Sequence, residues 1–325
     1  MIFPALSRLD GGTMSKLTSQ FASPIEAMLE YRAALGLSES TLNASLIKFD
    51  RYCSEHYPDC SVLTKELALE WLSVRGSGSV SGDASAIRQF SRYLTAIGQE
   101  AYVLPDGFYS AKSTFMPYIF SDIELSMFFR AADALPDRGK TNEVVIAPVL
   151  FRLIYTCGLR PNEGRELLRE NVNLSSGEML ITKTKWKKER TVVMSADMLS
   201  LCNKYDARLS PEREYFFPRC DGEPYTTTQA DRLFKKCWKT ANPGVTGLPN
   251  VRIYDLRHRF ASARLNRWLD EKRDLNAMLP YLSAYMGHKT ISETAYYVHI
   301  MPENLVKSAG VDWKSLNALL PEVNV

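Results

Sequence analysis

The sequence lacks long apolar runs, and this absence excludes one broad class of protein. No stretch of its 325 residues approaches the roughly 20 apolar residues that cross a bilayer, so a membrane protein is not expected. The opening MIFPALSRLDGGTM has no basic start followed by an apolar core. We therefore expect no secretory signal, and Met14 could be the true start. The expected location is the cytoplasm.

Paired cysteines are also missing. The six cysteines form no CxxC motif, and no histidine stands at zinc-finger spacing from them. A disulfide, a metal site and a cofactor are therefore not expected. We predict reduced, mostly packed thiols at Cys53, Cys60, Cys157, Cys202, Cys220 and Cys237.

The chain is long enough for two domains, and its charge is unevenly distributed along the sequence. A single core stops growing near roughly 250 residues, so this length suits two domains. The net charge is +3, but residues 1–117 carry ten basic against twelve acidic residues, and the remainder carries 30 against 25. The densest basic run is KTKWKKER, residues 183–190. Such a run can be a solvated turn, a nuclear-localisation-like patch or a phosphate contact.

Residues 21–100 show helical periodicity throughout, with apolar residues three or four apart. On one of these segments, Leu42, Leu46, Phe49 and Tyr52 form a single stripe. The pattern predicts four helices, in PIEAMLEYRAALG, TLNASLIKFDRYCSEHY, TKELALEWLSVRG and SGDASAIRQFSRYLTAIG.

The periodicity fades after residue 100 into a loop rich in proline and glycine, which predicts an interdomain linker ending near residue 117. We therefore expect a flexible N-terminus over residues 1–20, a helical domain with its linker over 21–117, a second domain over 118–301, and a tail over 302–325.

The second domain is predicted to be mainly helical with one small β-hairpin, an α+β arrangement. Ser121 and Glu124 have the spacing of a capping box. Pro161 is expected to open a helix in PNEGRELLREN, as proline favours a first turn. Residues 179–182 and 191–194 have strand character on either side of the basic run, which places lysines at the tip of a hairpin.

Several polar residues have two interpretations when each is taken alone. Arg160 precedes a helix N-terminus, where it could help to bind an anion or simply pair with Glu163. Tyr254 and Arg257 share a helix face, and His288 occupies a turn after Gly287. A surface ion pair and a capping histidine are the simpler interpretations.

Taken in order, four segments resemble the tyrosine recombinase (phage integrase) family. YTCGLRPNEGREL is similar to its first arginine box and KTKWKKER to its lysine-bearing hairpin. YDLRHRFAS is similar to its second arginine box, and MGHKTISETAYYVH to its histidine-to-tyrosine segment. The resemblance, looser outside these boxes, extends over roughly residues 20–300. It implies a helical core-binding domain joined to a catalytic domain.

The resemblance also implies a role for each residue. Tyr297, nine positions after His288, is the expected nucleophile, and Tyr296 a packing residue. Arg160, Arg257 and His288 would bind the phosphate, since guanidinium groups bind phosphate oxygens in pairs. Lys185 is the best candidate for the general acid, with Lys187 and Lys183 behind it. The remaining implied residues are Glu163 and His299 as supports, and Lys183, Lys187, Lys188 and Arg190 as DNA contacts.

One position departs from the family. The residue three before the second arginine is usually histidine, and here it is Tyr254. A phenol with a pKa near 10 accepts a proton from the nucleophile less readily than imidazole does. We therefore expect Tyr254 to donate a hydrogen bond to the phosphate or to position Arg257.

The implied function is that of a site-specific DNA recombinase that forms a 3′-phosphotyrosine intermediate without a metal. A homotetramer on double-stranded DNA, possible accessory DNA-bending proteins and a bacterial nucleoid location go with it. A non-catalytic DNA-binding relative and a type IB topoisomerase-like enzyme are the alternatives. The tail, residues 302–325, would either dock on a neighbouring protomer or pack on its own domain.

Overall fold

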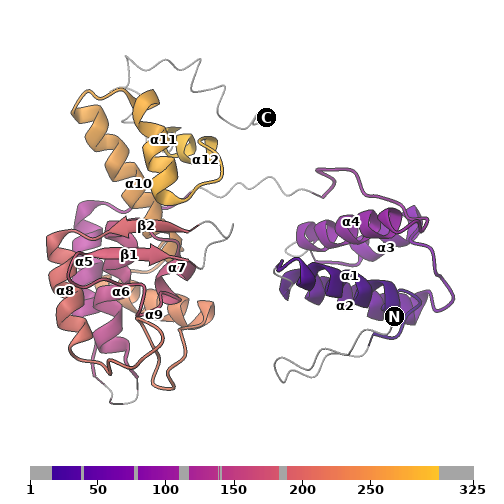
Figure 1. The fold of residues 1–325 in the computed structure, drawn as a ribbon, viewed down its shortest axis with the longest axis horizontal. Coiled ribbons are helices and arrows are strands. Elements are labelled where there is room, and N and C mark those ends of the chain that lie inside the picture. The colour runs from indigo at the N-terminus through magenta and orange to yellow at the C-terminus, as the bar shows by residue number, and fades with distance from the viewer. Residues whose placement is uncertain are drawn as a thin grey trace. The chain divides into compact units, whose positions relative to one another are not determined.

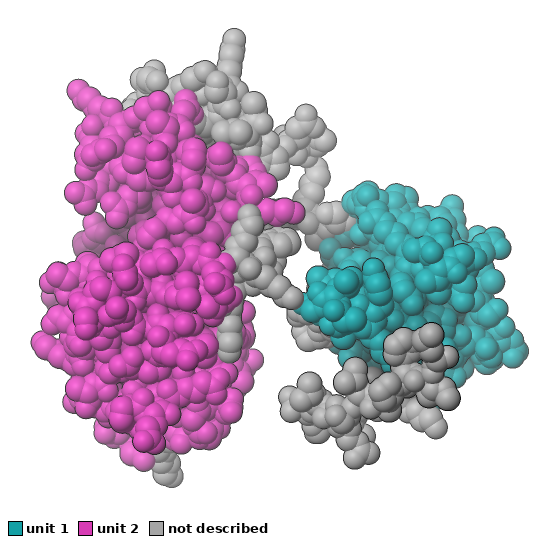
Figure 2. All heavy atoms as spheres, viewed as in Figure 1, with its two compact units in different colours: residues 1–114 teal, residues 115–325 magenta. Residues whose placement is uncertain are grey.

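The computed structural model describes residues 17–37, 40–76, 80–109, 117–137, 139, 141–182 and 189–299. The chain divides into two compact units, residues 1–114 and 115–325 (Figure 2). Helices dominate both units, and the described strands form one two-stranded sheet (Figure 1), which confirms the predicted fold class. Outside the described part lie the tail from residue 302, the hairpin residues Lys183, Lys185, Lys187 and Lys188, and the side chains of Tyr296 and His299.

Unit 1 contains the four helices that the periodicity predicts. Leu42, Leu46 and Phe49 are buried, as expected for one stripe on one helix. The Phe49 ring lies at the centre of the core, with its centroid 5.2 Å from that of Trp71 and 6.3 Å from that of Phe90. The helices are α1 (Ala22–Ala34), α2 (Ser40–His56), α3 (Lys65–Ser73) and α4 (Val80–Ala96).

Residues 17–20, at the end of the segment predicted to be flexible, have contacts with unit 1. The side chain of Leu17 is buried in the core of unit 1. The backbone N–H of Thr18 donates to Asp50 Oδ2 at 2.8 Å, and the Ser19 hydroxyl donates to Asp50 Oδ1 at 2.5 Å. A buried carboxylate on α2 therefore fixes the chain just before α1, because its oxygens need these donors.

Unit 2 is built around α6, an apolar helix that packs against α5, α7, α8, α9 and α10. The predicted capping box is present, with the Ser121 hydroxyl accepting from the N–H of Glu124 and the Glu124 carboxylate accepting from the N–H of Ser121. The helices are α5 (Asp122–Asp133), α6 (Glu143–Cys157), α7 (Pro161–Arg165), α8 (Ala196–Asp206), α9 (Thr227–Ala241), α10 (Ile253–Asp270), α11 (Leu275–Met286) and α12 (Ser292–His299).

The predicted hairpin consists of β1 (Glu178–Ile181) and β2 (Arg190–Val193), paired antiparallel with Ile181 opposite Arg190. Side chains alternate between the two faces of a strand. Val192 is buried, so Arg190, two residues earlier, is on the inward side of the hairpin.

Helix α7 is shorter than predicted. It begins at Pro161 as expected, but it ends at Arg165 instead of continuing through Asn171. The following residues bond to another segment: the N–H of Arg169 donates to the carbonyl of Glu214 at 2.8 Å, and the N–H of Phe216 donates to that of Leu167 at 2.7 Å. Pairing with a distant strand-like segment overrides the local helical preference.

A second apolar cluster joins the end of α10 to α11 and α12. Phe260, Leu265, Leu279, Met286 and Tyr297 are buried in it. The helix that carries the expected nucleophile is therefore attached to the helix that carries the second arginine box. Of the helices that the structure describes, none combines the length and the apolar character needed to span a membrane.

We expect Phe49→Ala to lower the free energy of unfolding of unit 1 by about 3–5 kcal/mol, because it leaves a cavity among buried aromatic rings. Tyr31→Ala is the matched control: it also removes an aromatic ring, but Tyr31 is 57% exposed whereas Phe49 is 0% exposed. The control is expected to cost well under half as much. Calorimetric unfolding of the full chain measures both, and equal losses would contradict this description of the core.

Candidate active site

The first arginine box lies at the C-terminal end of α6. This helix ends at Gly158, whose φ is +59°. A Cβ atom there would lie 2.4 Å from a ring carbon of Phe260, so both the backbone angle and the close approach of α10 require glycine. The turn that follows places Arg160 directly before Pro161 and α7.

A second glycine-terminated helix faces the first. Helix α11 ends at Gly287, with φ at +66°, and a Cβ there would lie 2.9 Å from Arg190 Nη1. Arg160 Nη2 donates to the carbonyl of Gly287 at 2.6 Å. Arg257 donates through Nη1 to the carbonyl of Gly158 and through Nη2 to that of Met286, both at 2.8 Å. Carbonyls at two helix C-termini, where the helix dipole favours cations, thus hold two guanidinium groups.

Glu163 is the carboxylate that these arginines share. Its side chain is 1% exposed. Arg160 Nη1 lies 2.8 Å from Oε1, Arg190 donates to both oxygens at 3.0 and 2.7 Å, and Arg257 Nη1 lies 3.9 Å from Oε2. Burial alone would raise the pKa of Glu163, but the hydrogen bonds and charges of Arg190 and Arg160 hold it below its ordinary value. The carboxylate is therefore ionised at neutral pH.

Three guanidinium groups around one carboxylate leave an excess of positive charge in a largely buried site. Arg257 is fully buried, and that burial lowers its pKa from the ordinary value, with the charge of Arg160 acting in the same direction. Buried charge is costly unless it is balanced. The site is therefore electrostatically prepared for an anion.

His288 lies in the turn after Gly287. Its Nδ1 is 2.6 Å from the hydroxyl oxygen of Thr294, and its ring stacks on that of Tyr297 with centroids 6.2 Å apart. Burial and the charges of Arg257, Arg160 and Arg190 lower the pKa of His288 to about 3. The imidazole is therefore neutral at pH 7. In the tautomer in which Nδ1 accepts from Thr294, Nε2–H is the available donor.

Tyr297 lies on α12 between two histidines, with 3% of its surface exposed. Burial raises the pKa of its phenol, while the charge and hydrogen bonding of Arg257 oppose that rise. Its hydroxyl oxygen is 3.1 Å from Nδ1 of His258. The sequence analysis missed His258, although it follows Arg257 directly in the second arginine box.

Tyr254 is half-buried one helical turn before His258 on α10. Its ring centroid lies 4.9 Å from that of His258. From the sequence, Tyr254 was expected to donate a hydrogen bond to the phosphate or to position Arg257. The structure shows in addition a ring contact between Tyr254 and His258, which was not expected. The role of Tyr254 stays a prediction.

The structure thus brings together six of the expected residues: Arg160, Glu163, Arg190, Arg257, His288 and Tyr297. Arg190 was expected to contact DNA, but its guanidinium bonds to Glu163 and, through Nε at 2.8 Å, to the carbonyl of Tyr285. In the protein alone it supports the site, and its contact with DNA stays a prediction. The hairpin lysines and the His299 side chain fall outside the described residues.

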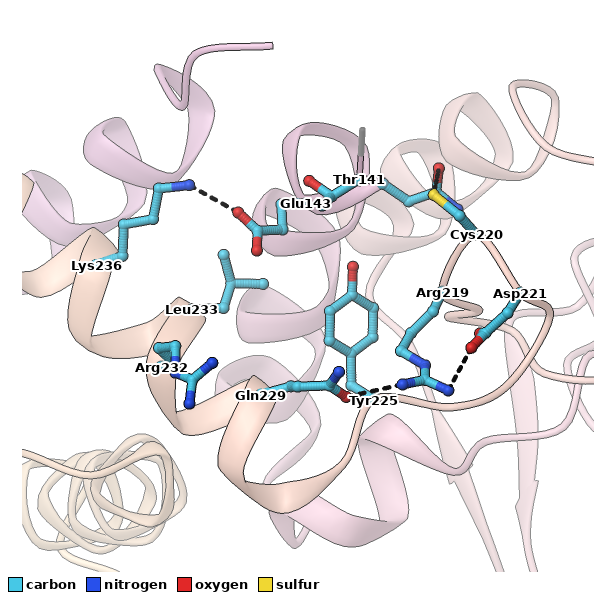
Figure 3. A pocket seen from close by; sticks show the side chains of 11 residues that line it. Thr141, Glu143, Arg219, Cys220, Asp221, Tyr225, Gln229, Arg232, Leu233 and Lys236 are labelled. Carbon is cyan, nitrogen blue, oxygen red and sulfur yellow. Dashed lines mark hydrogen bonds and ion pairs between the residues drawn. The ribbon is translucent and has the colours of Figure 1, made fainter. Parts of the chain in front are cut away.

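A separate hollow of about 440 Å³ lies near the start of α6 and along α9 (Figure 3). Lys236 Nζ there lies 2.7 Å from Glu143, and Arg219 lies 2.6 Å from Asp221, so much of its charge is internally paired. None of the expected site residues lines it. Within the described residues, no group of three His, Cys, Asp or Glu side chains could hold a metal ion.

The hairpin and the helices that carry the arginines, His288 and Tyr297 define a tyrosine recombinase fold. The model of the phage integrase family matches residues 132–304. A Sinorhizobium fredii protein named integrase/recombinase y4rE is 30% identical over 287 residues, which are 84% of this chain and 90% of the relative. The chain therefore belongs to the phage integrase, or tyrosine recombinase, family.

Solved structures show the same fold. The recombinase XerH bound to its difH substrate has a TM-score of 0.61 and 19% identity, covering 90% of this chain and 84% of that one. A lambda integrase tetramer bound to a Holliday junction has a TM-score of 0.57 and 16% identity, covering 85% and 76%.

We expect Glu163→Gln to lower the free energy of unfolding at pH 7 by about 3–5 kcal/mol, because it removes the only acidic partner that several buried guanidinium groups share among the described residues. Urea unfolding measures the change. Glu212→Gln, the same substitution at an exposed carboxylate, should stay within about 0.5 kcal/mol of the parent protein. A loss at position 163 no larger than that of the control would contradict the assigned role.

We also expect stability to fall as the pH drops below the unfolded histidine pKa of about 6.5. Burial, with nearby arginine charges, lowers the pKa of His258 to about 4 and that of His288 to about 3. Between 6.5 and these values the unfolded chain binds protons that the folded chain does not. Each histidine then contributes up to about 1.4 kcal/mol per pH unit, and nothing further above pH 6.5. Urea unfolding between pH 5 and 7 measures how the free energy of unfolding depends on pH. The double variant His258→Gln with His288→Gln should show a shallower slope than the parent protein, and an unchanged slope would refute the assignment.

Proposed function

We propose that the protein is a site-specific DNA recombinase that cleaves and rejoins strands through a 3′-phosphotyrosine at Tyr297. The observation that carries the proposal is the cluster of Arg160, Arg190 and Arg257 on Glu163, beside a buried tyrosine. Its excess positive charge suits a phosphodiester, and its nucleophile is adjacent. The DNA-bound relatives XerH and lambda integrase support DNA as the substrate.

In the proposed reaction Tyr297 attacks the scissile phosphorus and the 5′-oxygen leaves. Arg160, Arg257 and the Nε2–H of His288 stabilise the charge that develops on the nonbridging oxygens. Such donors act strongly because they are largely buried and already in position. The phosphotyrosine ester conserves the energy of the broken bond, so the 5′-hydroxyl of another strand can reverse the step. A hairpin lysine, Lys185 first, would protonate the leaving oxygen.

The two units have separate proposed tasks. Residues 21–117 would be the core-binding domain, and residues 118–301 the catalytic domain, together holding a duplex. Phosphate contacts by lysine and arginine would make binding strongly dependent on salt. A homotetramer on DNA is the proposed working assembly, with the lambda integrase tetramer as support, and the tail from residue 302 is its proposed protomer contact.

The test uses nicked duplexes that tile the DNA flanking the gene, because the target sequence is not defined by the protein. The wild-type chain should form a covalent protein–DNA complex, stable on a denaturing gel, in the presence of a chelator. Tyr297→Phe should form none, and Tyr296→Phe should still form it. Complexes formed by Tyr297→Phe but not by Tyr296→Phe would move the nucleophile to Tyr296.

Strand exchange then separates the candidate activities. Joining of the cleaved strand to a second labelled duplex would identify a recombinase. Relaxation of supercoiled DNA without exchange would identify a topoisomerase-like activity instead. Binding without any covalent complex would identify a non-catalytic DNA-binding protein.

A further inference from the structure

The hydroxyl of Tyr297 has a possible proton acceptor that the resemblance to the family did not assign. His258 Nδ1 lies 3.1 Å from the Tyr297 oxygen, within hydrogen-bond distance. The two rings are 5.4 Å apart between centroids. His258 comes from α10, whose packing against α12 fixes this contact. We infer that His258 is the general base that removes the proton of Tyr297, in place of the usual histidine at position 254. This inference rests on the proposed function.

The residues near Tyr297 are less suited than His258 to act as the base. Tyr254 contacts His258 through its ring, and a phenol is a poor proton acceptor at neutral pH. His288 already uses Nδ1 with Thr294, and its ring is nearly parallel to that of Tyr297, with the centroids 6.2 Å apart. Nδ1 of His258, by contrast, lies within hydrogen-bond distance of the nucleophile's hydroxyl oxygen.

The opposite side of the imidazole faces a carboxylate. Oδ1 of Asp255, one turn earlier on α10, lies 4.0 Å from Nε2 of His258, and Asp255 is fully buried. Asp255 is itself fixed, since its Oδ2 accepts the backbone N–H of Arg252 at 2.7 Å. Oδ1 also accepts from Arg252 Nη2 at 3.3 Å, and at 4.0 Å it makes no hydrogen bond to Nε2. Its negative charge nevertheless favours a proton on Nε2, the nearer ring nitrogen, which leaves the lone pair of Nδ1 facing Tyr297. It would also stabilise the imidazolium formed when His258 takes a proton.

The charged and titratable groups facing His258 explain when it can act. They are Tyr254, Asp255 and Arg257 on α10, Arg252 at its start, and Tyr297 on α12. Burial first, and then the charges of Arg252 and Arg257, lower the pKa of His258 to about 4. The imidazole is therefore an unprotonated acceptor at neutral pH. A bound phosphate would offset the arginine charges and strengthen this base when DNA is present.

The proposed step balances as follows. The O–H bond of Tyr297 breaks and its proton moves to Nδ1 of His258. The phenolate oxygen forms a bond to phosphorus while the bond between phosphorus and the 5′-oxygen breaks, and the leaving oxygen takes a proton from the hairpin lysine. In the reverse reaction the 5′-hydroxyl oxygen attacks phosphorus and its proton returns to the hairpin lysine. The bond between phosphorus and the Tyr297 oxygen breaks, and His258 returns its proton to the phenolate.

The test measures the single-turnover rate of covalent complex formation from pH 5.5 to 9, with the nicked duplex that the wild-type chain cleaves. His258→Ala removes both the hydrogen bond and the base. His258→Asn keeps an acceptor near the position of Nδ1 but cannot take a proton. Both should bind the duplex as the wild type does and cleave it about 10²–10⁴ times more slowly at pH 7, with the loss shrinking at high pH.

Two further variants complete the design. Tyr254→Phe should lose about tenfold or less, the effect of one neutral hydrogen bond. Adding Tyr254→His to His258→Asn should restore at least tenfold, because it supplies an imidazole at the usual position. In the protein without DNA, the ¹⁵N shifts of labelled histidine should show the proton of His258 on Nε2.

Several results would overturn the inference. Cleavage by His258→Ala within threefold of wild type, with the same pH profile, would show that no base acts at this position. Full activity of His258→Asn with loss in His258→Ala would reduce His258 to a positioning residue. A proton on Nδ1 would contradict the tautomer. Failure of the wild-type chain to form any complex would overturn the proposed function, and this inference with it.

Discussion

The site depends on one buried carboxylate. Glu163 is the shared partner of arginines from three separate segments: the turn after α6, the start of β2 and the N-terminal part of α10. Guanidinium groups this close repel one another, and in a medium of low polarity that repulsion is not screened by water. The carboxylate makes their proximity tolerable, and the carbonyls at the ends of α6 and α11 complete the coordination. Each element is thereby tied to the others through charge as well as through apolar packing.

The same electrostatics determine the protonation states around the nucleophile. A positive field with little water keeps His258 and His288 neutral, whereas exposed histidines titrate near 6.5. It also acts on Tyr297 in the direction that favours the phenolate, against the effect of burial. The neutral histidines and the phenol lie next to fixed arginine cations, and the negative charge of an incoming phosphate would balance those cations. The excess of positive charge therefore favours the binding of a phosphate more than it stabilises the fold.

Much of this could be predicted from the sequence, because it is written in local patterns. The helices of unit 1, the capping box at Ser121, the proline that opens α7 and the hairpin all follow from spacing between near neighbours. The grouping of Arg160, Arg257, His288 and Tyr297 was predicted from four boxes and their order. Non-local contacts could not be predicted in this way: the early end of α7 results from pairing with residues 214–216, and the anchoring of residues 17–20 results from Asp50.

The internal placement of Arg190 and the role of His258 could not be predicted for the same reason. On a basic hairpin any arginine suggests a phosphate contact, and only the strand register turns Arg190 inward to Glu163. His258 is four residues after Tyr254, so both lie on one face of α10, yet their distances to Tyr297 depend on how α12 packs. With tyrosine at position 254, the site still contains an imidazole on α10, one helical turn further along at position 258. The packing of α12 on α10 places an imidazole nitrogen 3.1 Å from the Tyr297 hydroxyl oxygen, and it is position 258 that provides it.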